Sequence, residues 1–210
     1  MASRPLRIVA LGDSTTSGFP GFASPLEAPP EGAGDPLCQY THWMMRAHPE
    51  WTVLNRGVRG ERSDEIRARF ERDVLGARPD LAILLVGVND LFQGRPVDHV
   101  RSQLSAMYAE AIDAGIVPVA ATILPADVGV PGLSAEILRL NEWIRVTALS
   151  LDVVYADTYA AAADPDRPTR LRDSSDGAHP DAEGHRRVGE ALVRAIEDYL
   201  ERSSGSRKAQ

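Results

Sequence analysis

The chain has 210 residues, of which 43% are apolar and 25% charged, and its formal net charge is −7 at pH 7. This composition excludes disorder over most of the length. The acidic balance argues against nucleic-acid binding, which usually needs a basic surface. The single cysteine, Cys38, excludes an internal disulfide framework. No stretch approaches the ~20 apolar residues of a membrane span.

The N-terminal residues lead directly into a short apolar run, Ile8–Leu11. A run of this length is too short for the core of a signal peptide, which needs roughly 7–15 residues, so we expect a cytoplasmic location. The chain is interpreted as one domain over residues 1–202. The small polar residues 203–210 predict a disordered tail. The sequence leaves the oligomeric state open.

Five short apolar runs alternate with longer amphipathic stretches. Most of these runs are almost continuously apolar, which is typical of strands buried on both faces of a parallel sheet. The runs are Leu6–Leu11, Trp51–Asn55, Leu81–Val86, Ile116–Thr122 and Val153–Ala156. Strands that alternate with helices imply right-handed β-α-β units. The sequence therefore predicts a three-layer α/β/α sandwich with about five parallel strands.

Helical patterns separate the strands. Asp35 and Pro36 predict the start of the first helix, and Ser63 is the predicted N-cap of the second. Apolar stripes predict further helices at about residues 96–114, 137–151 and 188–199. The segment Phe19–Gly34 is rich in Pro, Gly and Ala, which indicates a long loop beside the end of the first strand.

Candidate site residues follow the strands, because ligands of an open parallel sheet bind beyond its carboxyl edge. Four segments occupy that edge or its surroundings: Gly12–Gly18, Asn55–Gly60, Gly87–Asp90 and Asp176–Pro180. They lie far apart in the sequence. The predicted fold brings them to one rim.

The residue types on this rim are suited to acyl transfer. Ser14 is a candidate nucleophile, and a serine hydroxyl needs a base to accept its proton. His179 is a suitable base, because neutral imidazole accepts protons near neutral pH. Asp176, three residues earlier, can hold the ring through Nδ1–H and stabilise the imidazolium. Asp173 is also close, but the spacing favours Asp176.

Acyl transfer also requires donors for the oxyanion. The backbone N–H groups of Ser14 and Gly57 and the side-chain amide of Asn89 are suitable. One such donor typically lowers the barrier by about 3–4 kcal/mol. We expect Asp13 and Asp90 to brace the site from behind the reacting groups.

The four segments resemble the sequence blocks of the SGNH hydrolases, the GDSL-type esterase and lipase superfamily. Gly12-Asp13-Ser14 resembles the block that supplies the nucleophile, and Asn55-x-Gly57-x-x-Gly60 the block whose glycine N–H serves the oxyanion hole. Gly87-x-Asn89-Asp90 resembles the block whose asparagine completes that hole, and Asp176-x-x-His179-Pro180 the block of acid and base. The resemblance implies a flavodoxin-like sandwich with a five-stranded parallel sheet.

The predicted function is serine-dependent hydrolysis of a small-molecule carboxylic ester, with a short acyl group, without a cofactor. Alternatives with the same triad are an acyltransferase, a lysophospholipase or a thioesterase, and a non-catalytic binding module is a further one. A flavodoxin-like domain that binds FMN would leave the Asp176–His179 segment unexplained. No metal is expected, because the spacing of His179 and His185 is unusual for zinc. His185 is predicted to face solvent on the last helix.

Overall fold

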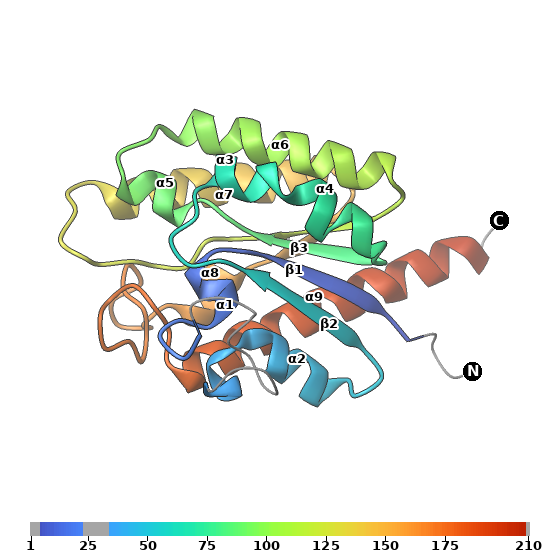
Figure 1. Cartoon of the computed structure of the whole chain (residues 1–210), viewed down its shortest axis with the longest axis horizontal. Coiled ribbons are helices and arrows are strands. Elements are labelled where there is room, and N and C mark those ends of the chain that lie inside the picture. Colours follow the sequence, from blue (N-terminus) through green and yellow to red (C-terminus); the bar gives the residue numbers. More distant parts are fainter. Residues whose placement is uncertain (1–4, 23–33, 209–210) are drawn as a thin grey trace.

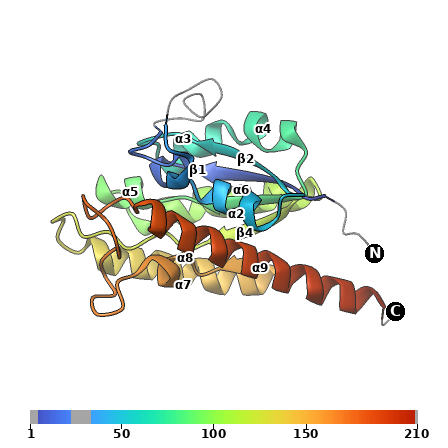
Figure 2. The ribbon, with the colours of Figure 1, turned by 90° about the horizontal axis from the view of Figure 1, so that it is seen from below.

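The computed structural model of the protein describes residues 5–22 and 34–208. These residues form a five-stranded parallel sheet between two layers of helices (Figures 1 and 2). The predicted three-layer α/β/α sandwich is therefore confirmed.

The sheet has the strand order β2-β1-β3-β4-β5. Its strands are β1 (Arg7–Gly12), β2 (Thr52–Gly57), β3 (Leu81–Leu85), β4 (Val117–Ala121) and β5 (Val154–Ala156). In register, Gly12 lies opposite Gly57 on one side and Leu85 on the other. The order changes direction between β1 and β3, and such a switch point opens a crevice at the carboxyl edge.

The longer helices cover both faces of the sheet (Figure 1). On one face lie α2 (Tyr40–Ala47) and α9 (Ala182–Lys208), and on the other α3 (Ser63–Ala68), α6 (Val97–Asp113) and α7 (Leu133–Leu151). Side chains of a strand point alternately to the two faces. Accordingly, Ile8 and Ala10 join the core under α2 and α9, while Val9 and Leu11 join the core under α3, α6 and α7.

Four helices of one turn or little more stand near the strand ends. They are α1 (Ser14–Ser17), α4 (Phe70–Asp73), α5 (Val88–Phe92) and α8 (Thr158–Ala162). Two 3₁₀ turns, Pro36–Cys38 and Leu75–Ala77, complete the helical elements of the described ranges. Asp35 caps the first of these turns, because its carboxylate accepts a 2.9 Å hydrogen bond from Leu37 N. The α-helix predicted to start here begins later, at Tyr40, with Gln39 as its N-cap.

Ser63 does not cap α3, contrary to the prediction; the N-cap is Arg62, and Ser63 is the first helical residue. Residues 203–208, which belong to the expected disordered tail, are described as the last residues of α9, which runs to Lys208. Extending a helix that packing has already nucleated costs little, so the polar composition of this segment does not end it.

Across the described ranges, no helix combines the length and apolar character that crossing a bilayer would demand.

Candidate active site

Ser14 begins α1 immediately beyond the carboxyl end of β1. Asp13 is the N-cap of α1, and its Oδ1 accepts a 2.9 Å hydrogen bond from Thr15 N. The Ser14 side chain is almost buried. At a helix N-terminus the first N–H groups have no intrahelical acceptor. The Ser14 N–H is therefore placed to donate to a developing oxyanion next to its own hydroxyl.

The structure brings Ser14, His179 and Asp176 together in one chain of hydrogen bonds. His179 Nε2 lies 2.9 Å from Ser14 Oγ, and His179 Nδ1 lies 2.7 Å from Asp176 Oδ2. An ionised carboxylate can only accept, so Nδ1 carries the hydrogen and Nε2 is left to accept the serine proton. This is the arrangement of nucleophile, base and orienting acid that acyl transfer needs.

The loop before α9 holds Asp176 ionised. Asp176 Oδ1 accepts from Ala178 N at 2.9 Å and from His179 N at 2.8 Å. Partial burial acts to raise the pKa of Asp176, but the hydrogen bonds from the His179 ring and from both N–H groups outweigh it and lower the pKa to about 2. Asp176 is thus a fixed negative charge beside the base.

Asp173, the other carboxylate considered for this role, pairs with two arginines and not with the base. Its Oδ2 lies 3.0 Å from Arg187 Nη2 and 3.4 Å from Arg172 Nε. The backbone of Asp173 accepts a hydrogen bond from Asp181 N, which closes the loop onto the start of α9. Asp173 therefore stabilises the loop that carries Asp176 and His179.

Gly57 does not take the predicted place among the oxyanion donors. Its N–H donates to Asn55 Oδ1 at 2.9 Å. The Asn55 amide in turn donates to Thr16 O at 2.6 Å. A Cβ on Gly57 would lie 2.0 Å from Ser17 N. Gly57 is a glycine because β2 must pack this closely against α1, and its N–H is used for that packing.

Gly60, three residues further along the chain, is neither tightly packed nor hydrogen-bonded through its N–H within the described part of the chain. Its φ is +81°, nothing lies within 4 Å of a Cβ built there, and the described residues offer its N–H no hydrogen-bond acceptor. The adjacent Glu61 carbonyl accepts from Asn89 Nδ2 at 2.9 Å. Gly60 and the Asn89 amide are therefore neighbours. A primary amide has two hydrogens, so Asn89 keeps one for another acceptor.

Arg69, which sequence reasoning did not single out, holds these loops together. Its guanidinium donates to Gly12 O at 3.0 Å, to Glu61 Oε2 at 2.7 Å and to Asp73 Oδ2 at 2.7 Å. The Arg69 side chain is buried. Arg69 thereby ties the end of β1 to the loop after β2. An arginine within a helical pattern gives no sequence signal for such a contact.

Asp13 and Asp90 both lie fully buried behind the reacting groups. Burial raises the pKa of Asp13 to about 6, against the lowering effects of the Thr15 N–H and of His179. Asp90 accepts from Ser63 N at 2.8 Å and from Ser63 Oγ at 2.7 Å. Asp90 therefore fastens α5 to the start of α3.

His185 is buried in α9, so the prediction that it faces solvent is wrong. Neither of its ring nitrogens has a hydrogen-bond partner among the described residues. Burial, together with the charge of His179, lowers the pKa of His185 to about 3. The sequence held a signal for this position, because His185 stands three residues before Val188 at the head of the apolar stripe of the helix.

One group of side chains has the composition of a metal site. Ligand atoms of Asp64, Asp90 and His99 lie within 4.8 Å of one another. Both oxygens of Asp90 already accept hydrogen bonds from Ser63, and Asp64 pairs with Arg62 at 3.2 Å. The two carboxylates therefore already have partners, whereas His99 Nε2, from α6, lies 3.8 Å from Asp90 Oδ1 and has no hydrogen-bond partner among the described residues.

A cavity of about 230 Å³ opens above the nucleophile. Its walls are mainly apolar, and the lining residues are Ser14, Thr15, Val88, Asn89, Phe92, Ala126, Val128, Leu133, Ala178 and His179. Phe19 lies against His179, with ring centroids 4.7 Å apart. The guanidinium carbon Cζ of Arg59 lies over the Phe19 ring, 4.0 Å from its centroid. The predicted loop Phe19–Gly34 begins here, but residues 23–33 lie outside the described residues.

The comparison with protein families decides the family. Residues 10–187 match the model of the GDSL-like lipase/acylhydrolase family. The chain belongs to this family. The matched range contains all four segments that the sequence placed at the rim.

Two relatives of this GDSL-like protein align with different shares of its length and of their own. A multidomain esterase of Ruminococcus flavefaciens is 29% identical over an alignment of 141 positions that covers 63% of this chain and 17% of that protein. An acetylxylan esterase of Geobacillus stearothermophilus is 23% identical over an alignment of 210 positions that covers 90% of this chain and 93% of that protein. The chain thus spans about one sixth of the multidomain relative and nearly all of the acetylxylan esterase.

The fold is shared with solved structures. The crystal structure of a GDSL-like lipase from Bacteroides thetaiotaomicron VPI-5482 matches with a TM-score of 0.73 and 21% identity, covering 93% of this chain and 92% of that one. At this identity the likeness concerns the sandwich fold.

Proposed function

We propose that this protein hydrolyses carboxylic esters through an acyl-enzyme on Ser14. The observation that carries the proposal is the hydrogen-bonded chain from Ser14 Oγ to His179 at 2.9 Å and from His179 to Asp176 at 2.7 Å. The family match over residues 10–187 supports the same chemistry.

In the first half of the proposed mechanism, Ser14 Oγ attacks the ester carbonyl carbon while its proton passes to His179 Nε2. The ionised Asp176 stabilises the imidazolium through Nδ1–H. The oxyanion is held by the Ser14 N–H, the free hydrogen of the Asn89 amide and the Gly60 N–H, which takes the role first assigned to Gly57. His179 then gives its proton to the leaving alcohol, and the C–O bond to that alcohol breaks.

In the second half, His179 takes a proton from water, and the resulting hydroxide attacks the carbonyl carbon of the Ser14 ester. The same donors hold the second oxyanion. When this intermediate collapses, the proton on His179 returns to Ser14 Oγ and the carboxylic acid leaves. The site contains each group needed for these steps, and the proposal requires no metal or cofactor.

Two observations support a small ester with a short acyl group as a substrate. The cavity above Ser14 measures about 230 Å³, and its walls Val88, Ala126 and Val128 are apolar. One relative, of which this chain covers 93%, is named for an acetyl ester of xylan. An acyltransferase would use the same groups with an alcohol in place of water.

The test is hydrolysis of p-nitrophenyl acetate and butyrate by the full chain and by two serine variants. Ser14→Ala should reduce kcat by about 10⁴-fold or more, because the nucleophile is removed. Ser150→Ala, whose hydroxyl bonds only to Thr147 O on exposed α7, should keep the wild-type rate. Mass spectrometry after a fluorophosphonate should place the label on Ser14.

Equal rates for the wild type and Ser14→Ala, with no fluorophosphonate adduct on Ser14, would refute the serine mechanism. Turnover that yields an ester in place of the acid, when an alcohol is added, would assign acyl transfer.

A further inference from the structure

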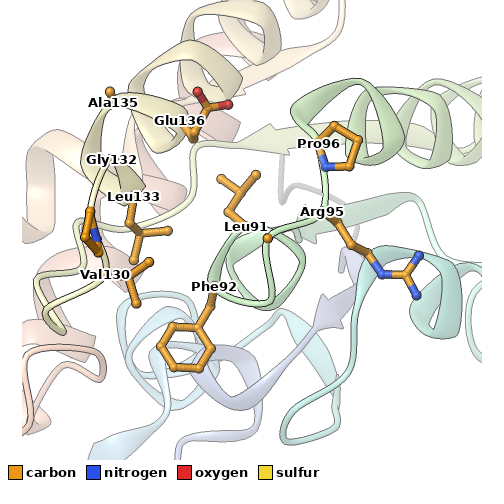
Figure 3. Close-up of a pocket in the computed structure, with 11 residues that line it drawn as sticks. Leu91, Phe92, Arg95, Pro96, Val130, Gly132, Leu133, Ala135 and Glu136 are labelled. Carbon is orange, nitrogen blue, oxygen red and sulfur yellow. The ribbon is translucent and has the colours of Figure 1, made fainter.

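A second cavity lies beside the one above the nucleophile. It measures about 400 Å³ and lies between α5 and the N-terminal turn of α7. Figure 3 shows Leu91 on one side and Val130 and Leu133 on the other, with Phe92 beyond them. Pro96 and Ala135 also line it. The walls at its centre are therefore aliphatic.

The two cavities adjoin each other. Phe92 and Leu133 line both of them. The Phe92 side chain is 52% exposed, so its ring stands between the two spaces without being locked in the core. Small-molecule sites usually measure about 300–1,000 Å³. The cavity above Ser14 is smaller than this by itself, and the two together fall within that range.

The second cavity lies on the acyl side of the reaction. His179 lines the first cavity and does not line the second. The leaving alcohol must receive its proton from His179, so this alcohol belongs at the His179 end. The carbon chain on the other side of the carbonyl then points toward Phe92, which ends the helix that carries Asn89.

The two charged residues that line the second cavity, Arg95 and Glu136, form ion pairs with residues outside it. Arg95 points away from the aliphatic walls in Figure 3, and its Nη2 lies 3.9 Å from Asp64 Oδ2. Glu136 pairs with Arg139 at 2.9 Å. A charged ligand would compete with these pairs, whereas an aliphatic chain needs only the apolar walls.

We propose that this second cavity binds the distal part of a medium-chain acyl group, octanoyl or decanoyl, with the chain passing over Phe92. The inference rests on the proposed ester hydrolysis and extends it, because it adds longer acyl chains to the short ones that the first cavity holds.

The test fills the cavity from the exposed position 135. Ala135→Trp places a large ring against the aliphatic walls at a site in the first turn of α7 that faces solvent. We expect the ratio of kcat/KM for p-nitrophenyl octanoate to that for the acetate to fall at least about tenfold, the least that one methylene contact contributes in an enzyme pocket. Leu149→Trp puts the same ring on an exposed part of α7 far along the helix and should leave the ratio unchanged.

Binding gives a readout that does not depend on turnover. Decanoate should bind to Ser14→Ala in calorimetry, with affinity lowered at least about tenfold when Ala135→Trp is added. Wild-type hydrolysis of acetate without hydrolysis of octanoate, or an equal effect of Ala135→Trp on both esters, would overturn the acyl cavity and leave the esterase proposal intact. Failure of every ester together with failure of the fluorophosphonate label would remove both.

Discussion

Gly57, the last residue of β2, and Gly60, in the loop that follows, differ in the space they leave for a methyl group. A Cβ on Gly57 would lie 2.0 Å from Ser17 N, whereas nothing lies within 4 Å of a Cβ on Gly60. Gly57→Ala should therefore lower the free energy of unfolding by about 1–3 kcal/mol or more. Gly60→Ala should cost about 1–2 kcal/mol, because its φ of +81° strains an L-residue.

The two variants should rank in the opposite order in turnover, with the larger loss of kcat in Gly60→Ala. Once Gly60→Ala relaxes its backbone, the N–H turns away from the oxyanion, and kcat should fall by about 10²-fold, as expected for loss of one donor. Urea unfolding and kcat on p-nitrophenyl acetate measure the two effects. A Gly60→Ala variant with wild-type kcat would contradict the donor role of this N–H.

Asp176 and Asp173 are a matched pair for testing the orienting acid. Asp176→Asn should lower kcat by about 10⁴-fold, because an amide can donate to Nδ1 and favour the wrong tautomer of His179. Asp173→Asn, which loses only pairs with Arg172 and Arg187, should retain most of kcat. A larger loss in Asp173→Asn would reverse the assignment.

The pH–rate profile adds a second check on Asp176. Its pKa is lowered to about 2, so this carboxylate stays ionised throughout the range in which the enzyme can be assayed. Any acid limb of kcat above about pH 4 must then come from another group. Persistence of such a limb in Asp176→Asn would agree with this, and its disappearance in that variant would assign the limb to Asp176.

At the scale of elements, the contact between α3 and α5 depends on one buried carboxylate. Ser63→Ala removes the hydroxyl that donates to Asp90 Oδ1 at 2.7 Å. A hydrogen bond to a charged group typically contributes about 1.5–3 kcal/mol, and the free energy of unfolding in urea should fall by that amount. Ser150→Ala, with its exposed hydroxyl, should change it by less than about 0.5 kcal/mol. Equal effects would show that the buried contact is not stabilising.

The elements were predictable where a periodic pattern was long enough to carry information. The five strands were found within one or two residues because buried parallel strands are continuously apolar, as in Leu81–Leu85. The short helices α1 and α5 were not predicted, since one turn gives no period to detect. A serine before a helix is a good N-cap when its side-chain oxygen accepts from the first turn of that helix. The prediction for Ser63 is wrong because its hydroxyl is bonded to Asp90 instead.

The site was predictable in its residue types and less so in its backbone. Ser14, Asp176 and His179 stand out because their chemistry depends on side chains that the sequence prints. The choice between Gly57 and Gly60 depends on which N–H already has an acceptor, and only the packing of Asn55 on α1 decides that. The role of Arg69 could not be predicted for the same reason, because it depends on contacts with Gly12 and Glu61. The burial of His185, by contrast, was predictable from its place at the head of the apolar stripe of α9.

At the scale of the whole molecule, His185 makes stability depend on pH. Its pKa falls from the usual 6.5 to about 3 in the folded protein. As the pH drops from about 6.5 to 3, His185 is therefore protonated in the unfolded chain and stays neutral in the folded protein. Over this window the free energy of unfolding should fall by about 5 kcal/mol because of this one residue. Above pH 6.5 His185 is neutral in both states, and no stability is lost through it.

Asp13 acts in the opposite direction over a narrower window. Burial raises its pKa from the usual 3.8 to about 6, so the folded protein binds a proton before the unfolded chain does. Between about pH 6 and 3.8 Asp13 adds about 3 kcal/mol of stability as the pH falls. The wild-type curve therefore reports both groups, and a variant is needed to isolate His185.

His185→Leu isolates that contribution, because both ring nitrogens lack partners and an apolar side chain suits the site better. A buried polar atom without a partner costs about 1–3 kcal/mol, so the variant should match or exceed the wild type in stability at pH 7. Its loss of stability between pH 6.5 and 3 should be smaller by about 5 kcal/mol. Chemical unfolding across this range measures the difference. An unchanged slope in His185→Leu would mean that the ring does not stay neutral in the fold.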